Sequence, residues 1–252
     1  MAQTALICGG SGKVSRQLTK LLTSQNPPWT VYSLIRKSSQ VAELEELGAK
    51  PIVQSIEDSS VSELASTIKN NNVDVVIWSA GAGGQGGPSR TDKVDRRGAI
   101  KSMDATAEAG VKRYIIVSAV DVRDRNKSVP SWYNEDDKSH SDKIWGGIGA
   151  YMAAKLAADT ELRNGNSKRG LEYTIVRPGL LLDEPAAGKV DAGKVHLKNG
   201  ISRADVAGVI LESIKNKGTI GLAFDLVGGD TPVAEAVKKV AEEKADTFEG
   251  HF

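Results

Sequence analysis

Short runs of consecutive apolar residues alternate along the chain with longer segments in which apolar residues recur every three or four positions. The first run, 5–8, is followed by Val14, Leu18 and Leu22, which share one face of a helix. The later runs that predict strands are 31–35, 51–53, 73–78, 114–118, 173–177 and 223–227. Runs without polar interruption are typical of parallel strands buried on both faces. We therefore predict an α/β fold of the Rossmann type, doubly wound, with a mostly parallel seven-stranded sheet and helices on both faces.

No linker, repeat or change of composition divides this alternation, so we predict a single domain over residues 1–252. Two segments depart from it. Residues 119–147 are long, polar and loop-like and carry Trp132 and Tyr133. We interpret them as a lid-like insertion, with a surface excursion as the alternative. Residues 178–200 form a variable stretch that we expect on the substrate side of the sheet.

The turn that joins the first predicted strand to the first helix carries Gly9, Gly10 and Gly12. At such a junction the unpaired N–H groups and the dipole of the helix favour an anion, and missing side chains let a pyrophosphate approach. Ser15 replaces the third glycine of the usual spacing, and its small side chain should separate helix and strand only slightly. We predict a dinucleotide site here, with a purely structural turn as the alternative.

Two basic residues, Arg36 and Lys37, follow the second predicted strand, at the end that faces the adenosine ribose in dinucleotide folds. An acid there would bind the 2′-hydroxyl of NAD, whereas arginine forms a charge-assisted pair with the 2′-phosphate of NADP. The cofactor is therefore predicted to be NADP (NADPH), and the alternative is a solvated basic turn. Ser55 and Ile56 follow the third strand, where an adenine edge would be bound, and residues 80–82 should pass beside the ribose and pyrophosphate.

Tyr151 and Lys155 lie four positions apart in a predicted helix and therefore share one face. Ionising an ordinary tyrosine at pH 7 costs roughly 4 kcal/mol, and a nearby ammonium together with an oxidised nicotinamide would offset part of this cost. Tyr151 would then exchange a proton with a substrate oxygen while Lys155 holds the nicotinamide ribose. The alternative is a chance pair in a lysine-rich chain.

Together these features resemble the short-chain dehydrogenase/reductase superfamily, in its atypical NADP-binding branch, over nearly the whole chain. The motifs that carry the resemblance are Gly9-x-x-Gly12, Arg36, Gly110–Tyr114, Tyr151-x-x-x-Lys155, Tyr173–Gly179, Ile201–Ala207 and Val227–Pro232. More narrowly, the chain is similar to small fungal members with no assigned activity, which have a similar insertion at Trp132 and Tyr133. The resemblance implies a Rossmann fold and the use of NADP, and it leaves the reaction open.

The catalytic set of that family is asparagine, serine, tyrosine and lysine, and the resemblance implies a partial match. Tyr151 and Lys155 match, and Asp95 takes the place of the asparagine. Ser118 resembles the first residue of the family's serine pair, but residues 119–120 are alanine and valine where the catalytic hydroxyl usually falls. The predicted cofactor-binding residues are Gly9, Ser11, Gly12, Lys13, Val14, Arg36, Lys37, Ser55, Ile56, Ala80, Gly81, Ala82, Lys155, Pro178, Gly179 and Leu180.

The composition argues against several classes of binding partner. A formal net charge of +1 gives no electrostatic reason to bind nucleic acid or an anionic membrane. One cysteine, Cys8, excludes an internal disulfide framework and suits a reducing compartment, and three widely spaced histidines suggest no metal site. Without a membrane-spanning run or a signal-peptide pattern, we expect a cytoplasmic monomer or homodimer that binds a small-molecule substrate.

Three functions follow from these observations. The leading one is an NADP-dependent oxidoreductase acting on a small carbonyl or alcohol, which Tyr151 with Lys155 favours. The alternatives are a regulatory protein that senses NADP without catalysis, and a flavin or quinone reductase. The missing serine hydroxyl favours these alternatives.

Overall fold

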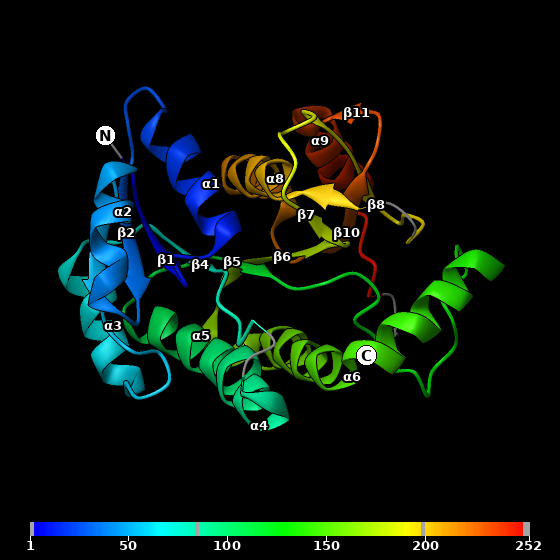
Figure 1. Cartoon of the computed structure of the whole chain (residues 1–252), viewed down its shortest axis with the longest axis horizontal. Helices are drawn as coiled ribbons and strands as arrows, with labels where there is room; N and C mark the ends of the chain where they lie inside the picture. The colour runs from blue at the N-terminus through cyan, green and yellow to red at the C-terminus, as the bar shows by residue number, and fades with distance from the viewer. Residues whose placement is uncertain (1–2, 84–85, 198–199, 249–252) are drawn as a thin grey trace.

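A continuous sheet forms the centre of the computed structural model, which describes residues 3–83, 86–197 and 200–248 (Figure 1). From edge to edge, the nine strands of this described sheet are β11 (Thr231–Pro232), β8 (Lys189–Gly193), β10 (Ala223–Gly228), β6 (Glu172–Pro178), β5 (Arg113–Val117), β4 (Val75–Trp78), β1 (Thr4–Cys8), β2 (Thr30–Ile35) and β3 (Lys50–Val53). The strands from β10 to β3 pair in parallel, whereas β8 and β11 add an antiparallel edge. The predicted α/β Rossmann-type fold is confirmed.

The predicted number of seven strands was wrong, because the antiparallel edge has a weak sequence signal. In β8 only Val190 and Gly193 are buried, and Lys189 and Asp191 are exposed. Such a half-buried edge strand lacks the continuous apolar run by which the parallel strands were recognised. The same segment, 178–200, also contributes β7 (Leu181–Leu182), which pairs with β9 (Ile201–Ser202) in a separate small sheet.

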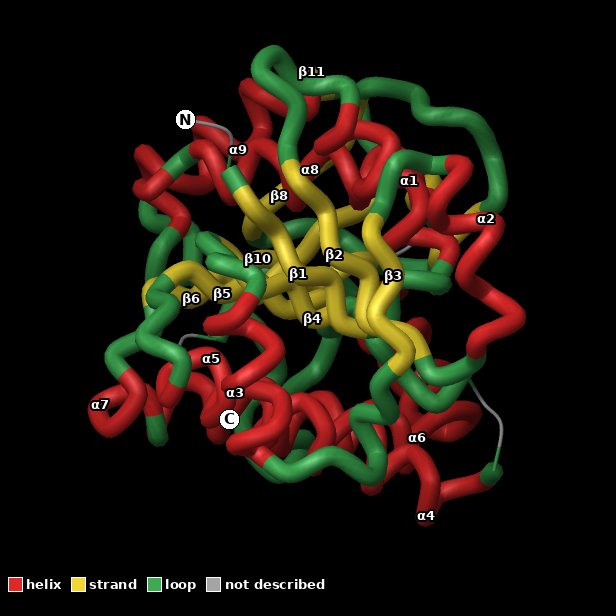
Figure 2. The backbone as a smooth tube through the Cα atoms, turned by 90° about the vertical axis from the view of Figure 1, so that its left-hand side faces the viewer, coloured by secondary structure: helices red, strands yellow, loops and turns green. Residues whose placement is uncertain are grey.

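Helices cover both faces of the sheet, as Figure 2 shows from the side. One layer holds α1 (Lys13–Thr23), α8 (Arg203–Lys215) and α9 (Val233–Glu243), and the other holds α3 (Val61–Asn70), α5 (Ala99–Glu108) and α6 (Glu135–Asn164). The shorter helices are α2 (Val41–Glu46), α4 (Gly87–Thr91) and α7 (Asn166–Arg169). Along β1, Ala5 and Ile7 pack in one apolar cluster and Leu6 and Cys8 in the other. Burial on both faces explains why the run has no polar position.

The Cys8 side chain is part of this core. It is buried, and desolvation raises the pKa of its thiol to about 12. A thiol that holds its proton at neutral pH is a poor nucleophile, so Cys8 serves packing.

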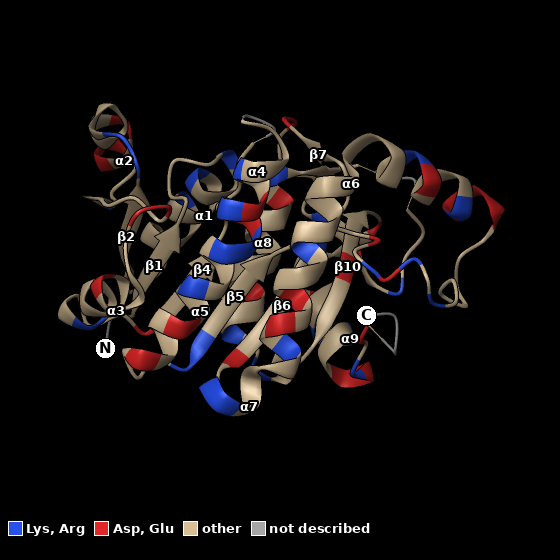
Figure 3. Cartoon of the chain, turned by 90° about the horizontal axis from the view of Figure 1, so that it is seen from below, with Lys and Arg blue, Asp and Glu red and all other residues tan. Residues whose placement is uncertain are grey.

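The segment 119–147 is less irregular than predicted, because its second half is helical. Helix α6 begins at Glu135 and continues to Asn164, with non-helical dihedral angles at Ile148 (φ −132°, ψ 32°). Asn134 and Asp137 form a capping box at its start, which stabilises a helix that has no apolar face. The first part of α6, residues 135–147, projects from the body of the protein and is called the polar arm below (Figure 1). Acidic and basic residues are interspersed along α6 (Figure 3).

Candidate dinucleotide and catalytic site

The glycine turn lies against the ends of β2 and β4 with no room for side chains. The N–H groups of Gly9 and Gly10 both donate to the Leu34 carbonyl, at 3.2 and 3.0 Å. A Cβ on Gly9, whose φ is +80°, would lie 2.7 Å from the Ala80 Cα. Ser15, at the position of the third glycine, is buried and donates to the Gly9 carbonyl at 2.9 Å. This hydrogen bond thus links the glycine turn to the helix that follows it.

A cavity of about 210 Å³ lies beside this turn, between the carboxyl ends of β2, β3 and β4. Of the predicted cofactor-binding residues, those that line it are Gly9, Ser11, Gly12, Arg36, Ser55, Ile56, Ala80 and Gly81. The residues that sequence reasoning missed are Leu34, Ile35, Gln40, Gln54, Glu57, Ser79, Arg90 and Val94. The predicted residues outside this lining are Lys13, Val14, Lys37, Ala82, Lys155, Pro178, Gly179 and Leu180. The cavity therefore corresponds to the adenosine half of the predicted site.

Cations and one carboxylate meet at the rim of this cavity. Arg36 Nη1 lies 3.0 Å and Arg90 Nη2 lies 3.3 Å from Glu57 Oε1, and Lys93 Nζ lies 3.7 Å from Glu57 Oε2. Nearby, Gln40 donates from its amide to the Ser11 hydroxyl at 2.8 Å. The predicted basic residue Arg36 is thus placed beside a second arginine, which comes from a distant helix.

The Lys155 side chain is buried, and its ammonium group lies close to oxygen atoms of two neighbouring residues. Its Nζ donates to the Val117 carbonyl at 3.1 Å, lies 3.5 Å from Asp95 Oδ1, and sits 5.5 Å from the centre of the Tyr151 ring. Asp95 in turn accepts a hydrogen bond from the Ala82 N–H at 2.9 Å. The structure therefore brings together three of the four predicted catalytic residues and ties them to the loop after β4.

Asp95 reaches this position from a π-helix, Asp92–Gly98, that lies between α4 and α5. A wider turn of this kind changes which residues face inward, and it occurs frequently at functional sites. In the structure the carboxylate is fully buried and paired with Lys155.

The charges of this cluster favour a protonated phenol and a protonated amine. Burial raises the pKa of Tyr151, although the Lys155 ammonium opposes this shift. Burial alone would lower the pKa of Lys155, but the neighbouring Tyr151, Asp95 and Asp159 outweigh it and raise this pKa. Tyr151 therefore holds its proton at neutral pH and is able to donate it.

Ser118, the fourth predicted catalytic residue, makes a different contact. Its Oγ donates to Asp159 Oδ2 at 2.6 Å, and both side chains are buried. Asp159 follows Lys155 by one further helical turn on the same face of α6, a spacing from which its position could have been predicted. Burial raises the pKa of Asp159 to about 6, against the opposing effects of Arg177 and of the Ser118 hydrogen bond.

The end of β6 completes this edge of the sheet. The Pro178 carbonyl accepts a hydrogen bond from the Val120 N–H at 3.0 Å, and the Gly179 N–H donates to the Leu226 carbonyl at 2.8 Å. The Leu180 side chain that follows is 71% exposed. The last of the predicted cofactor-binding residues at this edge therefore has an apolar side chain that faces solvent.

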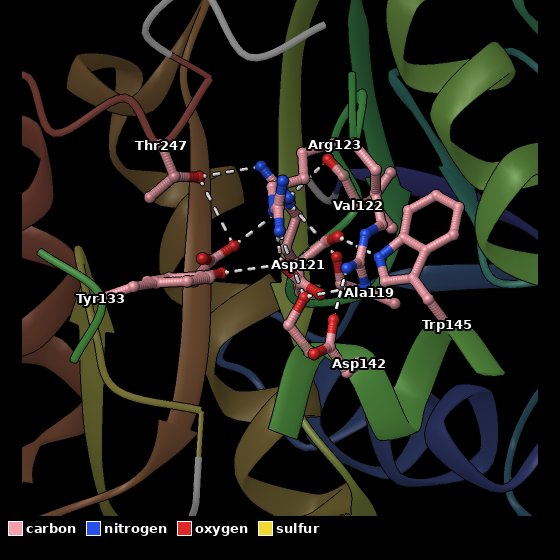
Figure 4. A network of polar contacts seen from close by, with 12 residues as sticks. Ala119, Asp121, Val122, Arg123, Tyr133, Asp142, Trp145 and Thr247 are labelled. Atoms are coloured by element: carbon pink, nitrogen blue, oxygen red, sulfur yellow. Dashed lines mark hydrogen bonds and ion pairs between the residues drawn. The ribbon is translucent and has the colours of Figure 1, made fainter. Parts of the chain in front are cut away.

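A buried polar network fastens the start of the insertion to the sheet (Figure 4). Asp121, with a φ of +58°, accepts hydrogen bonds on its carboxylate from Arg123 at 2.9 Å and from Tyr133 at 3.2 Å. Its backbone carbonyl accepts a third from the Trp145 indole at 3.2 Å. Arg177, from β6, donates to the Val122 carbonyl at 2.7 Å. Both halves of the insertion are thus held at one point.

The polar arm has a second attachment, at the start of α6. The Asp137 carboxylate contacts His196 Nδ1 at 2.6 Å and accepts a hydrogen bond from the Leu197 N–H at 2.8 Å. Tyr133 packs in the same small apolar cluster as Val195 and Leu197. The segments 119–147 and 178–200 are therefore in direct contact.

The described residues 3–83, 86–197 and 200–248 also lack two kinds of feature. No group of three or more histidine, cysteine, aspartate or glutamate side chains among them is arranged to hold a metal ion. None of their helices has the length and apolarity needed to cross a membrane.

A glycine turn between the first strand and helix of a parallel sheet, with a cavity beside it, defines a dinucleotide-binding Rossmann protein. The family model described as NAD(P)H-binding matches residues 9–217. The chain belongs to this NAD(P)H-binding family.

Three known proteins are similar to the chain over nearly its whole length. A UPF0659 protein of Schizosaccharomyces pombe is 37% identical over 92% of each chain. YhfK of Bacillus subtilis, named as an uncharacterized sugar epimerase, is 38% identical over 93% of this chain and 98% of its own. The solved structure of the oxidoreductase ylbE from Lactococcus lactis is 28% identical, with a TM-score of 0.76, over 95% of this chain and 97% of its own.

Proposed function

We propose that the protein is an NADP-dependent oxidoreductase that reduces a small carbonyl compound or oxidises the corresponding alcohol. The observation that carries this proposal is the buried cluster of Tyr151, Lys155 and Asp95 at the carboxyl edge of the sheet. Acid–base groups placed beside a dinucleotide turn suit hydride transfer coupled to proton transfer. The name oxidoreductase of the similar Lactococcus protein agrees with this assignment.

The residues present fit a dinucleotide. Gly9 and Gly10 let the turn pack directly against Ala80 and Ser33, and the N-terminus of α1 follows directly with Gly12 as its N-cap. This arrangement suits the pyrophosphate. Arg36 and Arg90 at the rim would hold the 2′-phosphate, and Lys155 would hold the nicotinamide ribose.

When bound, NADPH supplies the hydride. In the direction of reduction, Tyr151 donates its phenolic proton to the substrate oxygen as negative charge develops there. Because the pKa of Tyr151 is raised, the phenol keeps its proton until negative charge develops on the substrate oxygen. Lys155 stays charged between Asp95 and the Val117 carbonyl, and it stabilises the phenolate that remains.

One observation favours a second candidate. The Ser118 hydroxyl is bound to Asp159, and residues 119–120 supply no hydroxyl, so the second hydrogen bond to a carbonyl substrate has no donor at the family's usual position. A flavin or quinone accepts hydride without such polarisation. A quinone or flavin reductase is therefore the alternative that the same site supports.

The test is Tyr151→Phe, which removes one oxygen and keeps the ring. NADPH consumption should be followed for both forms across a panel of carbonyls, quinones and flavins. We expect carbonyl reduction to fall by roughly 10²–10⁴-fold while NADPH affinity is retained. The matched control is Tyr173→Phe, in a buried tyrosine on β6 outside the cluster, which should keep full activity.

Full carbonyl reduction by the Tyr151 variant would refute the assigned proton donor. Reduction of quinones or flavins alone, equally by both forms, would establish the second candidate. Binding of NADPH without reduction of any acceptor would indicate a sensor instead of an enzyme.

A further inference from the structure

Glu57 occupies an unusual position for a carboxylate, inside the group of cations that the proposed function assigns to the 2′-phosphate. One of its oxygens lies 3.0 Å from Arg36 and 3.3 Å from Arg90, and the other lies 3.7 Å from Lys93. The Glu57 side chain is only 16% exposed, and it lines the same cavity as the two arginines. The Glu57 carboxylate therefore already pairs with both arginines that would recognise the 2′-phosphate of NADP.

The backbone that carries Glu57 is fixed. Lys101, from α5, donates to the carbonyl of Ile56 at 2.9 Å and to that of Glu57 at 3.4 Å. The same ammonium also contacts the Ser59 carbonyl. Because one amine binds three backbone carbonyls of this loop, the Glu57 side chain is freer to move near the cavity than its backbone.

Glu57 remains an anion in this environment. Burial acts to raise the pKa of its carboxyl group, but the hydrogen bonds and charges of Arg90, Arg36 and Lys93 outweigh burial and lower this pKa. Asp58, the next residue, adds a second carboxylate 3.5 Å from Lys93. The rim thus combines three cations with two anions, and its attraction for a phosphate is smaller than the arginines alone would give.

We infer that Glu57 limits the preference for NADP over NAD by competing with the 2′-phosphate of NADP for Arg36 and Arg90. This inference rests on the proposed use of NADP at this site. The phosphate has to displace the carboxylate from the two guanidinium groups or share them with it, so Glu57 weakens NADPH binding. NADH brings a neutral 2′-hydroxyl and meets no such repulsion, and a carboxylate accepts a hydrogen bond from that hydroxyl. Glu57 therefore narrows the preference for NADPH over NADH.

The test compares Glu57→Gln with the natural chain and with Asp58→Asn as the matched control. Gln keeps the size of the side chain and removes its charge. Asp58→Asn removes one negative charge from the neighbouring residue, which is 77% exposed and contacts Lys93 but neither arginine in its ion pairs. Dissociation constants for NADPH, NADH and adenosine 2′,5′-bisphosphate are measured for all three forms by calorimetry, with thermal unfolding as a check of folding.

We expect Glu57→Gln to bind NADPH and the bisphosphate on the order of tenfold more tightly, because the negative charge that competes for Arg36 and Arg90 is removed. NADH affinity should change by less than about threefold, and Asp58→Asn should have the smaller effect on NADPH. Weaker NADPH binding by Glu57→Gln would show that the carboxylate orients the arginines, and equal affinities in all forms would show that it has no role. Either result overturns the inference.

These readouts are separate from those of the proposed function. They measure binding alone, so a protein that binds NADPH and reduces nothing would refute the oxidoreductase and leave the role of Glu57 measurable. Conversely, an active enzyme with unchanged Glu57→Gln affinities would keep the proposed reaction and lose this inference.

Discussion

Replacing Asp159 by asparagine should make the protein more stable at neutral pH and change how its stability depends on pH. Asp159 is fully buried, and its pKa rises from 3.8 to about 6 in the folded chain. Each pKa unit corresponds to about 1.4 kcal/mol, so ionising this group in the fold costs about 3 kcal/mol more than in the unfolded chain. Asparagine mimics the protonated acid and still offers an oxygen to the Ser118 hydroxyl.

The sign follows from the order of the two pKa values. The folded pKa lies above the unfolded one, so between pH 3.8 and about 6 the folded chain binds the extra proton. In that window the contribution of Asp159 to stability falls as pH rises, and above about 6 it is fully lost. The asparagine variant has no such loss and should gain up to about 3 kcal/mol over the natural chain on going from acid to neutral pH.

The assay is urea unfolding of both proteins at intervals from about pH 4.5 to 7.5. The difference in unfolding free energy should widen toward neutral pH. Asp104→Asn, in a surface carboxylate of α5 paired with Arg169, is the control, and this loss of an ion pair should not make the protein more stable than the natural chain. Parallel curves for Asp159→Asn and the natural chain would refute the argument that burial of this carboxylate dominates its energetics.

Two further predictions concern the cofactor. Arg36→Ala should weaken NADPH by roughly 10–100-fold and leave NADH within about threefold, as titrations of cofactor fluorescence would measure; equal losses for both would contradict phosphate recognition at Arg36. Gly10→Ala should destabilise the fold by roughly 1–3 kcal/mol and abolish dinucleotide binding, because the added carbon would lie 2.4 Å from the Ser33 Cβ. The same measurements on Gly147→Ala, which has nothing within 4 Å of the added carbon, should show neither effect, and unimpaired binding by Gly10→Ala would count against the turn as the pyrophosphate site.

Much of the fold was predictable because the parallel strands are buried on both faces. Their continuous apolar runs, the glycine turn and the helical spacing of Tyr151 and Lys155 are all local signals. The polar first half of α6 gave no such signal, because its helix is defined by a capping box and not by an apolar face.

The partners within the site were harder to predict than the residues themselves. Asp95 reaches Lys155 through a π-helix, and the regular helical period does not encode that wider turn. Glu57 and Arg90 are far apart in sequence and meet only because the loop after β3 and helix α4 lie at the same edge of the sheet. Ser118 was identified from a motif, yet its hydroxyl binds Asp159 in the fold. The motifs predicted the residues of the candidate site, but the pairing of their charges depends on tertiary structure.

The break in α6 has an electrostatic consequence for Tyr151. A helix concentrates partial positive charge on the unpaired N–H groups of its first turn, and a phenol placed there loses its proton more readily. Because the dihedral angles of Ile148 are non-helical, the part of α6 that carries Tyr151 starts directly after Ile148, and Tyr151 lies in its first turn. The field of this turn therefore acts together with the Lys155 ammonium and against burial, and it favours transfer of the phenolic proton to the substrate.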